Sequence, residues 1–105
     1  MISSINTALS GMQTWQLRQD ISANDIANIN TPGYSQKIPV QTTNSMGNPQ
    51  ISAISSEPNE SNETSNTDLA TEMVEQKMSV TGYGADAKII KVQDDMTKSL
   101  LNIIG

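Results

Sequence analysis

The chain has 105 residues, a net charge of −5 and a hydrophobic fraction of 35%, with one tryptophan, two tyrosines and no phenylalanine. This length fits one small domain, and so little bulky apolar material rarely fills a self-sufficient globular core. The absence of cysteine excludes disulfides and thiolate metal sites, and an acidic chain without a basic patch is a poor ligand for nucleic acid or anionic membranes.

A first helix is predicted over about residues 3–29. Its apolar residues recur in alternating steps of three and four, which is the spacing of a coiled-coil seam. The expected packing residues of this helix are Ile5, Leu9, Met12, Trp15 and Ile26. Gly11 weakens the helix by about 1 kcal/mol relative to alanine. We interpret it either as a tolerated weak point or as a place where another helix approaches closely.

The segment after this helix is polar. Thr31-Pro32-Gly33-Tyr34 ends the helix, because proline disfavours the α conformation before it and glycine permits the turn. Residues 36–42 and 50–55 could pair as a short, loose β-hairpin, although Pro39 weakens the first strand. Residues 56–66 carry no aliphatic or aromatic side chain, so we expect a solvated, mobile linker.

A second, longer helix is predicted over about residues 68–104. Asn66 or Thr67 can cap it, and acidic residues in its first turn suit the helix dipole. Its expected packing residues, again in steps of three and four, are Leu69, Met73, Val80, Tyr83, Ile90, Leu101 and Ile104. Gly82 and Gly84 together cost about 2 kcal/mol of helix propensity. A kink or local break could therefore form near the middle of this helix.

These elements predict an all-α fold. Two long terminal amphipathic helices would pair as a coiled-coil hairpin, joined by a polar, partly disordered middle with the β-hairpin as an option. The expected parts are residues 1–36 with the first helix and its turn, residues 37–66 as the polar linker, and residues 67–105 with the second helix. One such pair leaves much of each apolar face in water, so further copies of the chain are the simplest partner.

No catalytic site, metal site or cofactor is expected. Without histidine or cysteine, the usual nucleophile pairs are excluded, and a metal could use only oxygen ligands. Glu57, Glu60 and Glu63 could be imagined as glycan-cleaving carboxylates, but a glycosidase needs one desolvated carboxyl group and this segment offers no apolar pocket. Asp94 and Asp95 point in different directions on a helix, which favours a solvated face over a cation site.

The two ends of the chain each carry a sequence pattern that is typical of one protein family. Residues 22–34 read Ser-Ala-Asn-Asp-Ile-Ala-Asn-Ile-Asn-Thr-Pro-Gly-Tyr, within a longer matching stretch over 7–36. Residues 68–74, 83–90 and 94–103 form a second pattern at the other end. In order and position the two resemble the N- and C-terminal signatures of bacterial flagellar rod, hook and hook-associated proteins. The motif residues carried by this resemblance are Asn24, Asn28, Asn30, Thr31, Pro32, Gly33 and Tyr34.

The resemblance implies a structural subunit of the flagellar basal-body rod and no enzyme. The terminal helices would form the inner coiled-coil layer of a hollow tube that polymerises and transmits torque across the periplasm. Its partners would be copies of itself, other axial proteins and the flagellar type III export apparatus, with no nucleic acid and no direct membrane insertion. The chain start shows no secretory signal peptide, in keeping with export to the periplasmic rod without a cleaved signal.

Some alternatives stay open. Relatives usually carry Gln-Arg-Ala-Tyr-Glu-Ala where this chain has residues 80–85, Val-Thr-Gly-Tyr-Gly-Ala, which removes a charged pair. The short middle favours a proximal-rod component, whereas residues 32–36 also resemble the longer hook–filament junction proteins. A hook or junction protein is one alternative, and a helical adaptor or regulator of a flagellar partner is another. The motif asparagines fit either a helix-end cap or hydrogen bonds between subunits, and Trp15 fits seam packing or a neighbouring subunit.

Overall fold

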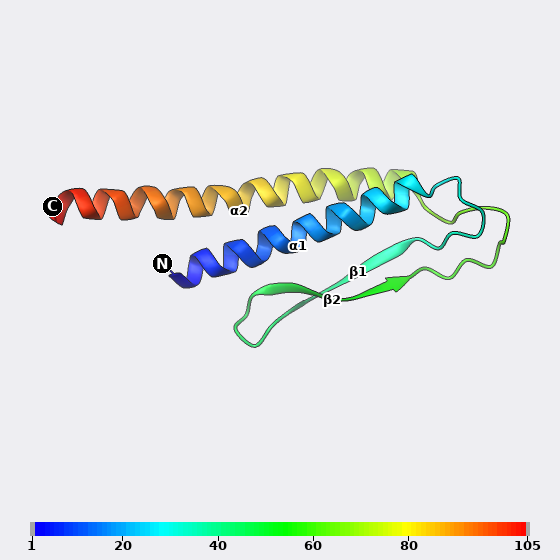
Figure 1. Cartoon of the computed structure of the whole chain (residues 1–105), viewed down its shortest axis with the longest axis horizontal. Helices are drawn as coiled ribbons and strands as arrows, with labels where there is room; N and C mark the ends of the chain where they lie inside the picture. The colour runs from blue at the N-terminus through cyan, green and yellow to red at the C-terminus, as the bar shows by residue number, and fades with distance from the viewer. Residues whose placement is uncertain (1, 105) are drawn as a thin grey trace.

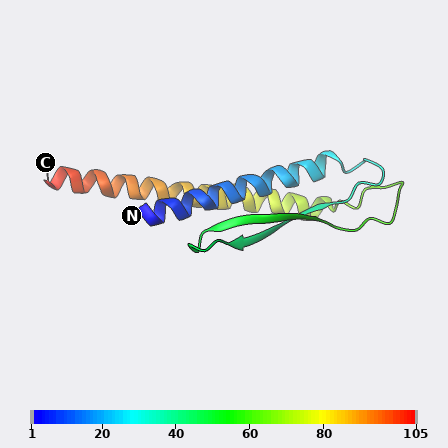
Figure 2. The ribbon, with the colours of Figure 1, turned by 60° about the horizontal axis from the view of Figure 1, so that its bottom comes forward.

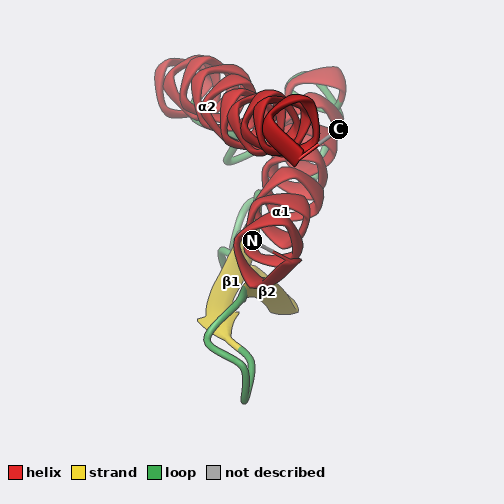
Figure 3. Ribbon diagram, turned by 90° about the vertical axis from the view of Figure 1, so that its left-hand side faces the viewer, coloured by secondary structure: helices red, strands yellow, loops and turns green. Residues whose placement is uncertain are grey.

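The protein is described by a computed structural model that covers residues 2–104. Its elements in chain order are α1 (Ile2–Ala27), β1 (Lys37–Thr43), β2 (Pro49–Ser56) and α2 (Leu69–Ile104). The molecule is a thin rod with extents of 67 × 26 × 13 Å. Helices α1 and α2 run antiparallel, side by side, in Figures 1 and 2. Figure 3 shows α1 as the middle layer, with α2 on one side and the hairpin of β1 and β2 on the other.

Both predicted helices form, and α2 is continuous. It runs for 36 residues through Gly82 and Gly84 as one helix, so the break considered from the sequence does not form (Figure 1). The predicted cap of α2 is wrong by one or two residues. The carboxylate of Asp68 accepts hydrogen bonds from the Ala70 N–H at 3.1 Å and the Thr71 hydroxyl at 3.0 Å. Asn66 instead accepts the Gln36 N–H at 2.6 Å.

The expectation of an all-α fold is wrong. Strands β1 and β2 pair antiparallel from Lys37↔Ser56 to Thr43↔Pro49, with an irregularity between Val40 and Gln41, so the fold is mixed α and β. Two physical reasons account for the difference. Both strands of a two-stranded sheet are edges, where proline is tolerated. The Asn44 side chain also accepts the Met46 and Asn48 N–H groups at 2.9 and 3.0 Å, and this closes the turn.

The segment expected as a mobile linker has a defined path in the structure. It runs beside the turn that follows α1, since the Gly33 N–H donates to the Thr64 carbonyl at 3.2 Å and the Asn66 N–H to the Tyr34 carbonyl at 3.2 Å. The Asn59 side chain donates to both the Tyr34 and Thr64 carbonyls, at 2.7 and 2.8 Å. Polar side chains thus replace apolar ones in holding this end of the molecule together.

Little of the interior is hydrophobic. Among the residues whose side chains are described, the buried hydrophobic ones are Ala8 and Ile21 alone. The buried polar or charged residues are Thr14, Ser22, Asp25, Asn48, Glu72 and Ser79. The large apolar side chains lie mostly at the surface of the helix pair, and this distribution decides where a functional site can be.

Candidate subunit interface

Small residues bring α1 and α2 together. A Cβ added to Gly11 would lie 2.9 Å from Asp86 Cγ, and one added to Gly82 would lie 2.7 Å from Trp15 Cδ2. Both distances are far below van der Waals contact, so these glycines mark close approaches between the helices. Of the two interpretations of Gly11, the close approach therefore fits the structure. Gly82 serves the same purpose, whereas a Cβ at Gly84 would meet nothing within 4 Å.

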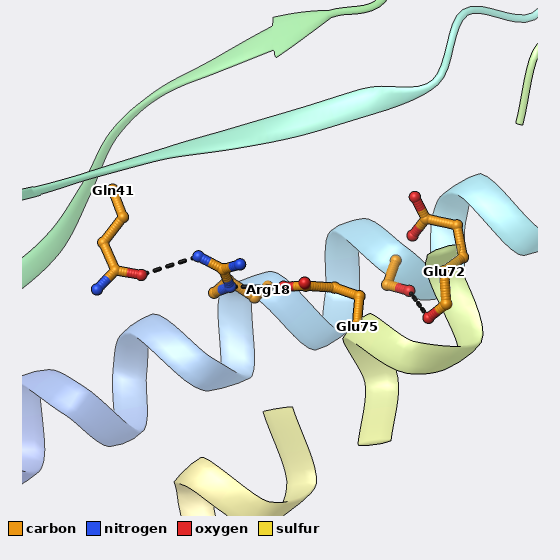
Figure 4. A network of polar contacts seen from close by, with 5 residues as sticks. Arg18, Gln41, Glu72 and Glu75 are labelled. Carbon is orange, nitrogen blue, oxygen red and sulfur yellow. Dashed lines mark hydrogen bonds and ion pairs between the residues drawn. The ribbon is translucent and has the colours of Figure 1, made fainter. Parts of the chain in front are cut away.

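Arg18 of α1 links its own helix to α2 and to β1. Its Nε lies 2.5 Å from the Glu75 carboxylate on α2, and its Nη1 donates to the Gln41 side chain on β1 at 2.8 Å (Figure 4). The guanidinium also lies over the Trp15 ring, 5.4 Å from the ring centroid. This charge is partly shielded from water and holds the hairpin, α1 and α2 in one arrangement.

A polar centre lies at the turn end of the helix pair. Asp25 is fully buried, and its Oδ1 accepts the Tyr34 hydroxyl at 2.7 Å and the Lys37 N–H at 2.9 Å. On α2, the Glu72 carboxylate accepts the Gln36 side-chain amide. Burial, followed by the hydrogen bond to Asp25, raises the pKa of Tyr34 well above its ordinary value. The motif tyrosine thus fixes the turn against the end of α1.

Most other motif residues shape this turn locally. The Asn28 side-chain amide donates to the Asn24 carbonyl at 2.8 Å, and the Thr31 hydroxyl donates to the Asn28 side chain at 3.1 Å. These contacts are those of a helix-end cap, one of the two roles considered for the asparagines. Gly33 has a φ of 73°, which favours glycine, while Asn30 and Pro32 lie exposed.

The predicted packing residues separate into two groups. Those half-buried by the fold of one chain are Ile5, Met12, Trp15, Ile26 and Ile90. Those left exposed are Leu9, Leu69, Met73, Val80, Tyr83, Leu101 and Ile104. Exposure is as high as 65% at Val80 and 82% at Ile104. One chain therefore covers only part of its predicted seam.

Sequence reasoning missed a second apolar stripe on α2. Its exposed members are three or four residues apart, except for an interval of eleven residues between the second and the third: Val74, Met78, Ile89, Val92, Met96, Leu100 and Ile103. The same step pattern could have revealed it, but reading one seam per helix hid it. A helix with exposed apolar residues on two sides can contact more than one further helix.

The C-terminal part of α2 also extends past α1. Ser3 and Ser4 of α1 line the same surface depression as Gln93 of α2. From Gln93, α2 continues to Ile104, and eleven further residues span roughly 17 Å at 1.5 Å per residue. Figure 1 shows this end projecting beyond the start of α1. Val92, Met96 and Leu100 line an open apolar groove on it. The projecting end therefore offers apolar surface that its own chain does not cover.

Other kinds of site find no support in the part of the chain that the structure describes. Within residues 2–104, no group of three or more acidic side chains could hold a metal ion. Neither helix, over its described length, is apolar enough to cross a membrane.

Comparisons with known protein families give matches at both helices. The family model described as flagella basal body rod protein matches residues 5–34, which are α1 and its turn. The model described as flagellar basal body rod FlgEFG protein C-terminal matches residues 59–103, which include almost all of α2. A search of curated proteins gave no match. Both matched families are structural proteins and not enzymes. The chain therefore belongs to the flagellar basal-body rod family and is a structural subunit of the rod.

Proposed function

We propose that this subunit polymerises through α1 and α2, packing them against the helices of its own copies and of other axial proteins. The observation that carries the proposal is the uncovered apolar surface of α2, on two stripes and on the projecting end. Burying an exposed leucine or isoleucine side chain contributes about 1.5–3 kcal/mol. Four such residues, at positions 100, 101, 103 and 104, supply a strong driving force for association.

The polymer is a rod that crosses the periplasm and transmits torque. Support for this role comes from the continuous 36-residue α2 and its close contact with α1, since two helices locked together resist bending better than one. Residues 1–36 and 67–105 are the polymerising ends in this arrangement. Residues 37–66 carry the hairpin, which lies on the face of α1 opposite α2 (Figure 3).

The subunit reaches its position through the flagellar type III export apparatus, without a cleaved signal peptide and without entering the membrane. The small hydrophobic interior suits a chain that passes through a channel unfolded and folds afterwards. N-terminal sequencing of rod-incorporated protein tests this point: the incorporated subunit should start at the same residue as the newly made chain.

Two matched variants test the polymerisation. Leu101→Asp with Ile104→Asp places charge on the projecting end of α2, whereas Met46→Asp places it at the hairpin turn, where the side chain is 84% exposed. In cells that lack the native subunit, the first variant should abolish rod assembly and motility, with the membrane ring retained. The Met46 variant should assemble normally.

The circular dichroism spectra of both purified variants should match the spectrum of the native chain, since neither change touches the α1/α2 contact. The proposal fails if the doubly charged variant still builds a complete rod. It fails equally if the native chain forms only a discrete complex of fixed stoichiometry with one partner.

A further inference from the structure

Two acidic side chains meet inside the molecule. Asp25 of α1 is completely buried, and both of its hydrogen-bond donors, the Tyr34 hydroxyl and the Lys37 N–H, point at Oδ1. Within residues 2–104, no N–H or O–H group donates to Asp25 Oδ2. The carboxyl of Glu72 lies beside that of Asp25: it is itself only 5% exposed and accepts the side-chain amide of Gln36, the residue next to Lys37. Two ionised carboxylates have no hydrogen to place between them.

The pKa of Glu72 reflects this position. Burial raises it above the ordinary value of 4.5, and the negative charge of Asp25 and contact with its carboxyl raise it further. Hydrogen bonds from Gln36 and Ser22 act in the opposite direction. The net direction is upward, so the folded chain holds a proton at this site more tightly than the unfolded chain does.

The nearby cations are engaged elsewhere. Arg18 of α1 pairs with Glu75 of α2 and donates to Gln41 (Figure 4). The Lys37 ammonium on β1 donates to the Ser56 hydroxyl at 2.9 Å. Glu57, on the segment after β2, lines the same surface depression as Glu72 and adds negative charge. No element packed around the pair therefore supplies a neutralising positive charge in the described structure.

We propose that Asp25 and Glu72 share one proton, and that this proton acts as a latch that closes the turn end of the helical hairpin. With the proton, one carboxyl group donates to the other and joins α1 to α2. Without it, two buried negative charges face each other and push the helices, the turn and β1 apart. The latch works within one chain and does not depend on polymerisation.

The sign of the pH effect follows from linkage. Because the folded state binds the proton more tightly, the stability due to this site is fully present below pH 4.5 and is lost as pH rises through the raised folded value. Asp86 on α2, which is only partly exposed, has a pKa raised in the same direction by desolvation. All chains compared below therefore carry Asp86→Asn, so that the remaining pH dependence reports on the pair.

Three variants of the full-length chain, Glu72→Gln, Asp25→Asn and Glu60→Gln, distinguish the effect of the shared proton from the effect of removing any one negative charge. Glu60 lies exposed on the polar segment, so its variant removes one negative charge without touching the pair. Helix content of the parent should fall as pH rises from 4.5 to 8.5, and Glu60→Gln should behave like the parent. Glu72→Gln and Asp25→Asn should lose this dependence and raise the melting temperature at pH 8 by about 4 °C or more.

A second measurement needs no variant and therefore still tests the proposal if a variant fails to fold. Nuclear magnetic resonance of the unmutated chain, with labelled glutamate carboxyl carbons, follows the titration of each glutamate. The Glu72 carboxyl should titrate above 4.5. The latch is refuted if Glu72 titrates at its ordinary value, or if Glu72→Gln keeps the parent's pH dependence. A chain with no helix at any pH would also refute it, since the latch closes the hairpin of a single subunit.

Discussion

Two glycines in the middle of α2 provide a matched pair of positions with opposite expected responses. Gly82 and Gly84 lie two residues apart in the same helix, and both lower its intrinsic propensity. Their surroundings differ, because Gly82 faces the Trp15 ring and Gly84 faces open space. Replacing each by alanine adds the same methyl group to two different environments.

The structure gives the size of each effect. At Gly84, alanine should raise the free energy of unfolding by about 1 kcal/mol, the ordinary gain in a helix interior. At Gly82, the new Cβ would lie 2.7 Å from Trp15 Cδ2 and nearer still to two other ring atoms. Overpacking of this kind costs about 1–3 kcal/mol, which cancels or exceeds the same gain. We expect Gly84→Ala to be more stable than Gly82→Ala by roughly 1–3 kcal/mol.

Urea unfolding followed by circular dichroism measures the difference. The fluorescence of Trp15 adds a local signal, because it is the single tryptophan of the chain. Its emission should change in Gly82→Ala and stay unchanged in Gly84→Ala. In a Trp15→Ala background, Gly82→Ala should regain the stabilisation seen at Gly84. Equal stabilisation by both alanines in the native background would mean that the helices do not pack at Trp15.

Three further perturbations test the polar contacts. Arg18→Met should lower the free energy of unfolding by about 1–2 kcal/mol in urea titrations and shift Trp15 emission, because it removes the ion pair to Glu75 and the charge over the ring. Tyr34→Phe should cost about 1–3 kcal/mol, since it removes a donor to a buried carboxylate. Because the pKa of Tyr34 is raised, its contribution should be present below pH 10 and lost above it, so alkaline loss of helix should weaken in this variant. Asp68→Ala should cost about 1 kcal/mol by removing the cap of α2, measured by thermal unfolding.

Local patterns were enough to predict the helices and the turn. Steps of three and four locate α1 and α2, and Pro32 with Gly33 marks the end of the first helix to within a few residues. These features depend on residues close in sequence. The hairpin was harder, because its alternation is partial and Pro39 argues against a strand unless the sheet is known to have only edges.

Contacts between distant residues could not be predicted in the same way. Asp25 and Glu72 lie 47 positions apart, and each has an ordinary local explanation as a polar helix residue or a dipole partner. Gly82 suggested a kink because nothing in the sequence indicates that Trp15 lies against it. A seam also does not reveal which face its own chain covers. The close approach at Gly11 was therefore only one of two interpretations, and the large residues were assigned to the contact.

The sparse hydrophobic interior has a thermodynamic consequence. The heat-capacity change of unfolding grows with the apolar area newly exposed to water, and polar exposure lowers it. With Ala8 and Ile21 as the buried hydrophobic residues of residues 3–104, an isolated chain should show a value below the about 12–15 cal per mole per kelvin per residue of ordinary domains. Its stability should then vary almost linearly with temperature, with little of the curvature that makes ordinary domains weaken on cooling.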